Sequence, residues 1–569
     1  MRTIWGEKID IENILPEYPR PQMERDSYIN LNGIWEYAIT ETKDFPESFE
    51  GEIIVPFSPE SELSGVKRSL SPTQTLWYRR SLHLPQDFNE GRVLLHFGAV
   101  DQIATVYVND KEVCHHVGGY TPFSSDITDY IKEENVIVVK VRDTSDTSYH
   151  SRGKQKIKRG GIWYTPQSGI WQTVWLESVP EQYIEGLRIT PMFDEDEVEL
   201  IVYSNSALQC KATCGESEII FMANEPARLP INSPIPWTPE NPHLYDLDVT
   251  MGKDHVKSYF GMRKFSVDRD ENGVMRLFLN DRPYFHNGLL DQGYFSDGLY
   301  TPPSDEAMIF DIKAAKELGF NMLRKHIKIE PLRWYYHCDR LGMLVWQDMV
   351  NGGGDYSFLT VSTPLVTGIH FKDDRYKLFG RQDPEGREQF YRELDEMITH
   401  LYNVVSIAMW VPFNEGWGQF DAKVAVERIQ QLDTTRTIDH ASGWHDQYIG
   451  NIKSLHVYFK KYRFKKDRLG RAVVLSEFGG YNHRVEGHCY NEKDFGYRRF
   501  DTREQLLRAY RDLYLDEIVP AKEKGLCAAV YTQLTDVEDE LNGLITYDRK
   551  VIKISAEEIR DINEMLLDK

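Results

Sequence analysis

The chain has 569 residues, of which 41% are hydrophobic and 27% are charged, so its composition is that of a globular protein and its length predicts about three or four domains. The net charge of −22 opposes contact with phosphate backbones and disfavours a nucleic-acid-binding function. No run of about 18 apolar residues is present, and the first residues lack the basic and apolar pattern of an export signal. We therefore expect no membrane association and a cytoplasmic location.

The 1–180 segment is expected to form a β-sandwich of jelly-roll type. Short runs rich in β-branched and aromatic residues recur in it, and Gly, Pro, Asn and Asp separate them. These runs include GIWEYAI, LWYRRSLHL, GRVLLHFGA, IATVYVND, NVIVVKVRD and WQTVWLESV. Several of them alternate in or near period two, as strands of a sandwich do.

The 181–267 segment predicts a second and smaller sandwich of immunoglobulin-like type. Its candidate strands are IEGLRITPMF, EVELIVYSN, LYDLDVTM and HVKSYFGMRKF. The Pro-rich stretch NSPIPWTPENP is expected to be a stiff connection within this domain.

The 268–569 segment changes rhythm, because apolar runs now alternate with amphipathic helical stretches such as SDEAMIFDIKAAKELG. The candidate strands are PYFHNGLL, FNMLRKH, GMLVWQDM, SIAMWVPFNE, TIDHASG, SLHVYF, AVVLSEFG and LCAAVYTQLTD. Eight such runs favour a (β/α)8 TIM barrel. A doubly wound open sheet is the alternative, although no Gly-rich phosphate turn follows the first strand.

Six cysteines are scattered along the chain. Cys210 and Cys214 form a C-x3-C pair, but no second Cys or His pair lies nearby in sequence to complete a zinc site. We interpret the cysteines as free thiols of a reducing compartment. No metal site and no cofactor are therefore predicted, while an ion held by dispersed residues is left open.

Two acids end candidate barrel strands: Glu415 ends SIAMWVPFNE, and Glu477 ends the VVLSE part of AVVLSEFG. The active site of a barrel lies at the carboxyl ends of its strands. Burial there can keep one carboxyl protonated while polar neighbours keep another ionised. Glycosidic cleavage requires such a pair. A single Glu in this place is more often a salt-bridge partner in a loop, but two on different strands favour catalysis.

Motifs in all three segments resemble glycoside hydrolase family 2, the family of the bacterial β-galactosidases and β-glucuronidases. WYRRSLHLP, FGAVDQIATVYVND, HVGGYTPFSSDIT and SGIWQTVWLE resemble its sugar-binding jelly roll. WTPENPHLYDL and SYFGMRKF resemble its immunoglobulin-like domain, and LGFNMLRKH, CDRLGMLVWQD, PFNEGWG and LSEFGG resemble its barrel. The resemblance implies a retaining exo-glycosidase that acts on a glycoside or oligosaccharide through a covalent glycosyl-enzyme.

The resemblance also implies roles for individual residues. Glu415 corresponds to the acid/base, Asn414 to the residue that hydrogen-bonds the sugar 2-hydroxyl, and Glu477 to the nucleophile. Arg324 corresponds to an arginine that keeps the nucleophile ionised, with a salt bridge at the barrel rim as the alternative. His326 approximates a substrate-binding histidine, although KHIKIEP departs from the family's pattern and a structural histidine is nearly as well supported.

Four further side chains are expected near the substrate. Tyr458 is placed to hydrogen-bond the nucleophile, with packing as the alternative. Trp346, Asp348 and Trp444 are expected to line the pocket, although aromatic residues at such positions are core about as often as sugar platforms.

The sequence departs from the family at the positions that choose the sugar. Asp291 stands where β-galactosidases carry a histidine, so it is expected to bind sugar hydroxyls, with an exposed turn acid as the alternative. Leu544 follows Asn542 where β-glucuronidases carry an Asn-x-Lys lysine that binds the sugar carboxylate. A neutral sugar is therefore preferred, because an unpaired carboxylate would be desolvated at a cost.

The first choice is a β-galactoside, the family's commonest substrate, with an α-L-arabinofuranoside or a β-mannoside as alternatives. A non-catalytic carbohydrate-binding protein on the same scaffold is the rival from another class. The 351–382 segment is too long for a simple strand-to-helix connection, so it is expected to be a substrate lid, or else a disordered insertion. Homo-oligomerisation is left open.

Overall fold

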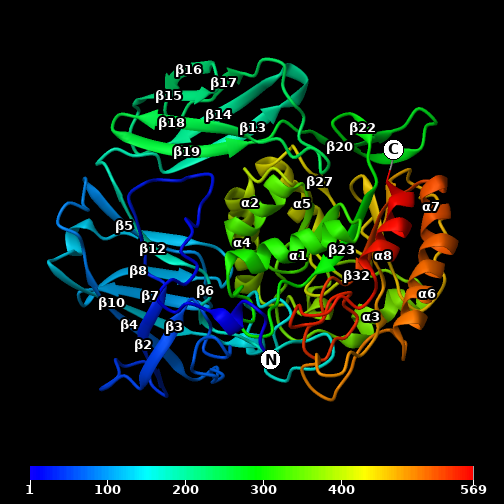
Figure 1. Ribbon diagram of the computed structural model, residues 1–569, viewed down its shortest axis with the longest axis horizontal. Helices are drawn as coiled ribbons and strands as arrows, with labels where there is room; N and C mark the ends of the chain where they lie inside the picture. The colour runs from blue at the N-terminus through cyan, green and yellow to red at the C-terminus, as the bar shows by residue number, and fades with distance from the viewer. Residues whose placement is uncertain (568–569) are drawn as a thin grey trace.

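The computed structural model describes residues 1–567 and contains two β-sandwich regions and a parallel barrel (Figure 1). In Figure 1 the first sandwich lies at the left in blue and cyan, the second lies at the top, and the barrel lies at the right. This arrangement confirms the predicted fold class of jelly roll, immunoglobulin-like sandwich and TIM barrel.

The first sandwich packs a six-stranded sheet, in the order β3-β2-β4-β10-β7-β8, on a four-stranded sheet in the order β1-β12-β5-β9. In β10 the alternate residues Ile137, Val139 and Val141 are buried between the sheets, as the near-alternating pattern predicts. The strands are β1 (Tyr28–Asn30), β2 (Gly33–Thr40), β3 (Gly51–Val55), β4 (Thr75–His83), β5 (Arg92–Phe97), β6 (Val100–Asp101), β7 (Ile103–Val108), β8 (Lys111–Val117), β9 (Phe123–Asp126), β10 (Glu134–Arg142), β11 (Gly169–Ile170) and β12 (Val174–Val179).

The second sandwich packs the sheet β13-β14-β17 on the sheet β16-β15-β18-β19, and all its strand pairs are antiparallel. Cys210 and Cys214 are buried in its core as free thiols. The strands are β13 (Gly186–Met192), β14 (Glu197–Tyr203), β15 (Gln209–Cys214), β16 (Ser217–Met222), β17 (Ala227–Pro230), β18 (Tyr245–Met251) and β19 (Asp254–Phe260).

The barrel is an eight-stranded parallel sheet in the order β27-β26-β25-β24-β23-β32-β29-β28, preceded by the small sheet β20-β21-β22. Every residue of β25, β26, β29 and β32 is buried, because a barrel strand is covered on both faces. The strands are β20 (Phe265–Arg269), β21 (Met275–Leu279), β22 (Arg282–Pro283), β23 (His286–Asp291), β24 (Met322–Lys325), β25 (Leu344–Asp348), β26 (Ile407–Val411), β27 (Thr437–Ile438), β28 (Ile452–Val457), β29 (Ala472–Gly479), β30 (Tyr481–Asn482), β31 (Arg498–Arg499) and β32 (Leu526–Thr532).

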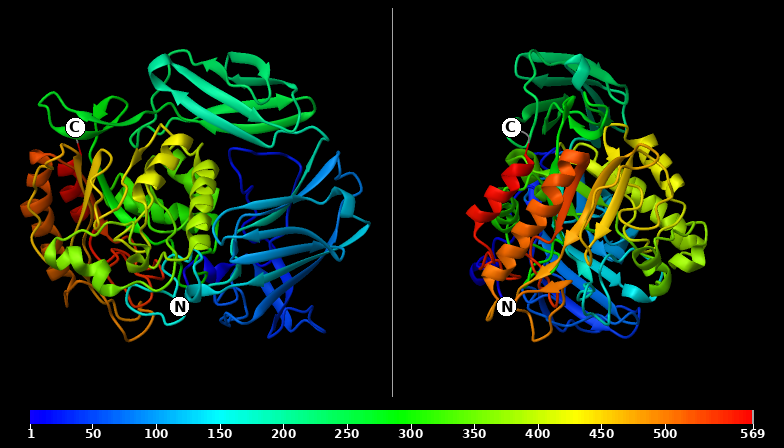
Figure 2. Two further views of the ribbon diagram at one scale, coloured as in Figure 1. Left: turned by 180° about the vertical axis from the view of Figure 1, so that it is seen from behind. Right: turned by 90° about the vertical axis from the view of Figure 1, so that its right-hand side faces the viewer.

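Helices cover the outside of the barrel (Figure 2). The longest, α4, begins where Asp383 caps the backbone N–H groups of Glu385 and Gly386, and Phe390, Leu394 and other apolar residues at helical spacing face the barrel. No helix among residues 1–567 is long and apolar enough to cross a membrane. The helices are α1 (Asp305–Glu317), α2 (Leu332–Leu341), α3 (Phe358–Thr367), α4 (Pro384–Leu401), α5 (Ala422–Leu432), α6 (Arg503–Leu513), α7 (Val519–Lys524) and α8 (Ala556–Asn563).

The loop at 143–168, between β10 and β11, docks on the barrel loops that follow β25 and β32. The Arg152 backbone N–H donates to the carbonyl of Asn351 over 2.9 Å, and the Arg159 guanidinium pairs with Asp539 over 2.9 Å. The first sandwich thus contributes side chains to the end of the barrel where the strands terminate.

The segment at 351–382 contains α3 and a 3-10 turn at Tyr376–Phe379 and is held against the barrel. Arg381 donates to the carbonyl of Gly418 over 2.8 Å, and Tyr376 donates to Asp421 over 2.8 Å. A disordered insertion is therefore the wrong alternative, and the role of a substrate lid stays a prediction.

Candidate active site

Glu415 and Glu477 lie together at the carboxyl ends of two barrel strands. Glu477 is the sixth residue of β29, and Glu415 stands four residues after the end of β26. The exposed fraction is only 8% for Glu415 and 4% for Glu477. One carboxylate oxygen of each lies within 4.8 Å of the other, so both can reach one ligand atom placed between them.

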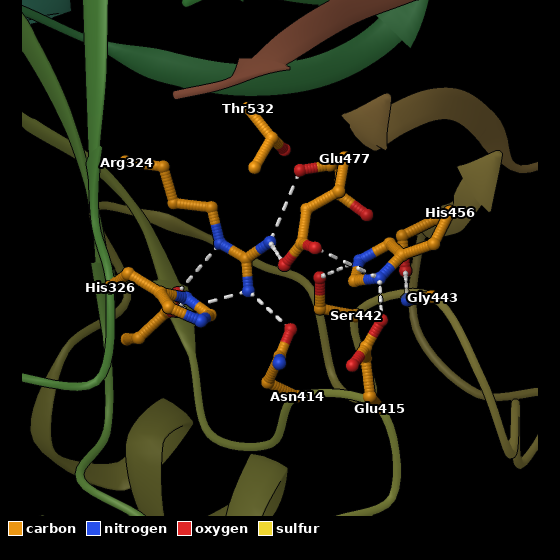
Figure 3. Close-up of polar contacts among 12 residues, drawn as sticks. Arg324, His326, Asn414, Glu415, Ser442, Gly443, His456, Glu477 and Thr532 are labelled. Carbon is orange, nitrogen blue, oxygen red and sulfur yellow. Dashed lines mark hydrogen bonds and ion pairs between the residues drawn. The ribbon is translucent and has the colours of Figure 1, made fainter. Parts of the chain in front are cut away.

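Glu477 is surrounded by groups that stabilise its ionised form (Figure 3). Arg324 donates to one carboxylate oxygen over 3.1 Å, and Tyr458 donates to the other over 2.5 Å. Burial alone would raise the pKa of Glu477, but the charges of His456 and Arg324 hold that pKa at about 2. A carboxylate that is buried, ionised and only partly hydrogen-bonded is suited to act as a nucleophile.

Arg324 connects most of the predicted site residues. It lies on β24 with no exposed surface, pairs with both oxygens of Asp348 over 2.9 and 3.0 Å, and donates to the Asn414 side-chain oxygen over 2.8 Å. His326 Nδ1 lies 2.7 Å from Asp348. The bond from Arg324 orients the Asn414 amide so that its nitrogen, which has no partner in the described chain, remains available to a ligand.

Glu415 is presented by a turn in which its own backbone has φ of +51°, a left-handed conformation that is costly for a residue with a side chain. Its backbone N–H donates to the carbonyl of Ser442 over 2.9 Å. Its carboxylate lies 2.7 Å from Nδ1 of His456, whose Nε2 lies 3.2 Å from the Ser442 hydroxyl. A Cβ on Gly443 would stand 2.5 Å from the His456 ring, so glycine permits this close approach.

His456 is a site residue that the sequence analysis did not identify. It contacts both glutamates, because its Nδ1 also lies 3.4 Å from Glu477. Its sequence signal was available: His456 is two residues before Tyr458, and alternate residues along a strand point to the same side. The Tyr458 ring itself stacks on Tyr497 with centroids 3.7 Å apart, a contact that no local pattern indicates.

Three sequence-based placements need correction. Trp346 has no exposed surface and donates to His286 over 2.9 Å within the barrel core, so it does not line the pocket. Asp291 is 1% exposed and lies within the chain's own charge pairs, with its oxygens accepting from Lys325 over 2.7 Å and from the Gly293 N–H over 2.9 Å, so it is not the exposed turn acid that the sequence offered as the alternative. Leu544 is 1% exposed and packs in the core, so its side chain does not line the pocket.

The remaining predicted residues lie at the site. Trp444 is half-buried, with its ring centroid 6.2 Å from that of His456, which places it at the wall beside Glu415. Asp348 is 1% exposed and reaches the glutamates only through Arg324 and His326, so it positions other side chains.

Among residues 1–567, one group of three potential metal ligands lies close together, and it consists of Glu415, His456 and Glu477. Two of its three ligand groups are the carboxylates of Glu415 and Glu477, which glycosidic cleavage requires. An ion held there would therefore compete with the sugar. That the chain needs no cofactor stays a prediction.

Comparisons with known proteins agree with this geometry. The chain matches three family models: "Glycosyl hydrolases family 2, sugar binding domain" over residues 65–180, "Glycosyl hydrolases family 2" over 183–263, and "Glycosyl hydrolases family 2, TIM barrel domain" over 302–479. Together they cover more than half of its length.

Its curated relatives carry two kinds of name. A β-galactosidase of Thermoanaerobacter pseudethanolicus is 25% identical over 363 residues, which are 57% of this chain and 47% of that protein. A β-glucuronidase of Formosa agariphila is 24% identical over 410 residues, which are 63% of this chain and 38% of that protein. The chain thus spans less than half the length of these two relatives.

Among solved structures, a β-D-glucuronidase of Dictyoglomus thermophilum aligns with a TM-score of 0.74 over 96% of this chain and 98% of that one. The identity is 17%, so this likeness shows the fold alone.

Proposed function

The chain belongs to glycoside hydrolase family 2, and we propose that it is a retaining exo-glycosidase in which Glu415 is the acid/base and Glu477 the nucleophile. The observation that carries the proposal is the separation of the two carboxylates, whose nearest oxygens lie within 4.8 Å. Retaining enzymes place the two groups about 5–5.5 Å apart, whereas inverting enzymes leave about 6.5–9.5 Å for a water molecule. The short separation favours direct attack by Glu477.

The surroundings of the two acids support the division of roles. Glu477 attacks the anomeric carbon while Glu415 gives its proton to the glycosidic oxygen, so that the bond to the leaving group breaks as the glycosyl ester forms. Glu415 then takes a proton from water, which hydrolyses the ester and restores both carboxyls. Asn414 is placed to hydrogen-bond the sugar hydroxyl next to the reacting carbon.

We base the proposed sugar on the names of the relatives. Leu544 is not used for this purpose, because its side chain packs in the core. A β-galactoside remains a candidate because relatives carry that name, and a β-glucuronide is equally supported by its relatives. An α-L-arabinofuranoside and a β-mannoside remain the alternatives within the family. The alternative of a non-catalytic carbohydrate-binding protein is disfavoured because both glutamates keep their partners. Arg324 contacts Glu477, and His456 contacts Glu415.

A mechanism-based label tests the proposal. The protein is incubated with 2-deoxy-2-fluoro-β-D-galactosyl fluoride and, separately, with the corresponding glucuronyl fluoride. The 2-fluoro substituent slows both formation and hydrolysis of the ester, whereas the good leaving group speeds formation alone, so the ester accumulates. Peptide mapping should find the added mass on Glu477, within LSEFGG. A label on Glu415, or aryl glycoside turnover with inverted configuration of the first product, would overturn the assignment.

A further inference from the structure

One lysine near the site is largely buried, and its ammonium group has no ionic or hydrogen-bonding partner. Lys154, in the 143–168 loop of the first sandwich, is 7% exposed. Within residues 1–567 its Nζ forms neither an ion pair nor a hydrogen bond, and its contacts are with the rings of Trp417 and Tyr164, whose centroids lie 5.6 and 5.9 Å away. The side chain is therefore largely buried while its nitrogen stays accessible, and an ammonium in such a place gains from an anionic acceptor.

The neighbours of Lys154 place it at the end of the barrel that carries the two glutamates. Trp417 stands two residues after Glu415, and the Tyr164 hydroxyl donates to Glu540 in the loop that follows β32. Burial lowers the pKa of His326, and the charge of Lys154 lowers that pKa further. Lys154 therefore lies among the loops that follow β24, β26 and β32, at the rim of the site.

The other buried lysines nearby differ from Lys154 because each of them has an acidic partner. Lys325 contacts Asp291 over 2.7 Å and Glu330 over 2.8 Å. Lys328 contacts Glu330 over 2.9 Å and donates to the carbonyls of Gly293 and Tyr300 over 2.6 and 2.8 Å. The charge of each is thus compensated within the protein, whereas the charge of Lys154 has no ion-pair partner in residues 1–567.

Glu540 feels the charge of Lys154 but forms no ion pair with it. Its carboxylate accepts hydrogen bonds from the Tyr164 hydroxyl and, over 3.1 Å, from the Asn542 amide. Burial raises the pKa of Glu540, against the opposing charge of Lys154. The cation thus keeps its three N–H donors for a group from outside the chain.

We propose that Lys154 binds an anionic substituent, a carboxylate or a sulfate ester, on the terminal sugar of the substrate. A sugar hydroxyl accepts one hydrogen bond but leaves the charge uncompensated, whereas an anion satisfies both its charge and its donors. The inference rests on the proposed function, because it names the class of sugar that the same site cleaves. It replaces the neutral sugar that the sequence analysis preferred.

The backbone around Lys154 is held in a way that suits a binding group. Its carbonyl accepts from the Tyr164 N–H over 2.9 Å, and the backbone N–H groups of Arg152 and Gly153 donate to the carbonyl of Asn351 over 2.9 and 3.1 Å. A fixed backbone lowers the entropy that a ligand must overcome to engage the side chain.

The test compares Lys154→Met with the matched control Lys156→Met. Lys156 lies in the same loop, and its Nζ likewise contacts a ring, that of Trp163 at 4.2 Å. The measured quantity is kcat/KM for 4-nitrophenyl β-D-galactoside, its 6-sulfate, β-D-galacturonide, β-D-glucoside and β-D-glucuronide. The wild-type chain should prefer an anionic substrate to its neutral counterpart, and Lys154→Met should lower kcat/KM for that substrate by about 30-fold or more while changing the neutral ones less than about threefold.

The uronide and sulfate substrates show whether the anion is a carboxylate or a sulfate ester. A loss of kcat/KM in Lys154→Met that is confined to either kind of substrate supports the proposal. A wild-type preference for neutral sugars, or an equal loss on all substrates in Lys154→Met, would overturn it. Thermal unfolding of both variants, together with Lys154→Arg, identifies a loss caused by misfolding, because Arg keeps the charge and should keep the anionic preference. If the fluoro probes still label Glu477 while the preference is absent, the inference fails and the proposed function stands.

Discussion

Two buried charge clusters lie side by side at the end of the barrel, and adjacent residues of β24 belong to different ones. Arg324 belongs to what we call the active cluster, with Asp348, Glu415, His456 and Glu477. Lys325 belongs to what we call the closed cluster, with Asp291, Lys328 and Glu330. Both clusters are almost entirely removed from solvent.

The clusters differ in direction and in completeness. Successive side chains of a strand point to opposite faces, so Arg324 faces the glutamates, while Lys325 points to the ring of Trp334 on α2 at 4.1 Å. In the closed cluster each charge is paired within the protein. In the active cluster Glu415 and Glu477 can both contact a ligand placed between them. Burial and charge are thus shared by both clusters, and incomplete pairing distinguishes the one that we assign to catalysis.

The largest effect that would sharpen this comparison is expected from Glu415→Gln in the active cluster. Loss of the proton donor should lower kcat by about 10²–10⁴-fold for substrates with poor leaving groups. Activated aryl glycosides should suffer far less in the first step, and added azide should restore turnover and give a glycosyl azide of retained configuration. The measurements are kcat for one substrate with a poor leaving group and one with a good leaving group, and the configuration of the azide product by NMR. Equal losses on both substrates would refute the role of Glu415.

A second and smaller effect is expected from Arg324→Gln, with Arg324→Lys as the control that keeps the charge. Because Arg324 helps to depress the pKa of Glu477 to about 2, its loss should raise that pKa by about 1–3 units. The reaction needs Glu477 ionised, so the acidic limb of the kcat/KM profile should move to higher pH, and the maximum should fall by about 100-fold. An unmoved limb in Arg324→Gln would show that other groups set this pKa.

The smallest effect on activity is expected from Asp291→Asn in the closed cluster. Lys325 would lose one of its two acids, so the free energy of unfolding should fall by about 2 kcal/mol while kcat/KM changes less than about threefold. Denaturant unfolding and steady-state kinetics measure the two effects. A raised KM with unchanged unfolding would instead restore the sugar-binding role that the sequence suggested.

This deficit should depend on pH in a defined direction. Burial acts to raise the pKa of Asp291, but the charge and hydrogen bond of Lys325 together with the hydrogen bond from the Gly293 N–H outweigh burial, and the folded pKa is lowered. The stabilisation by Asp291 is therefore present above the unfolded value of about 3.9 and is lost as the pH falls through the folded pKa. The difference between wild type and variant should shrink on acidification.

The barrel and its two glutamates could be read from the sequence because both depend on local patterns. Strands buried on both faces appear as near-continuous apolar runs, and each of the eight runs corresponds to an observed strand. Glu415 and Glu477 follow such runs, so their position at the catalytic end is a consequence of strand direction. The position of Arg324 near the carboxyl end of β24, another strand of the same barrel, is set in the same way.

Charge pairing could not be read in this way. Asp291 and Trp346 stand at positions as suggestive as that of Arg324, yet one is paired with Lys325 and the other lies in the core. Lys154 belongs to the first sandwich, whereas the glutamates that it approaches belong to the barrel, and no local pattern connects Lys154 with Trp417. Each of these outcomes depends on contacts between segments far apart in the chain.

The sequence by itself determined the order of the domains, the strands of the barrel and the pair of acids at their ends, because hydrophobic periodicity and strand direction are local properties. The tertiary structure alone decided which buried charges are paired, from Lys325 with its two acids to Lys154, which has no ion-pair partner in residues 1–567. The physical reason is that the cost of a buried charge depends on the partners within hydrogen-bonding distance, and packing of distant segments places those partners.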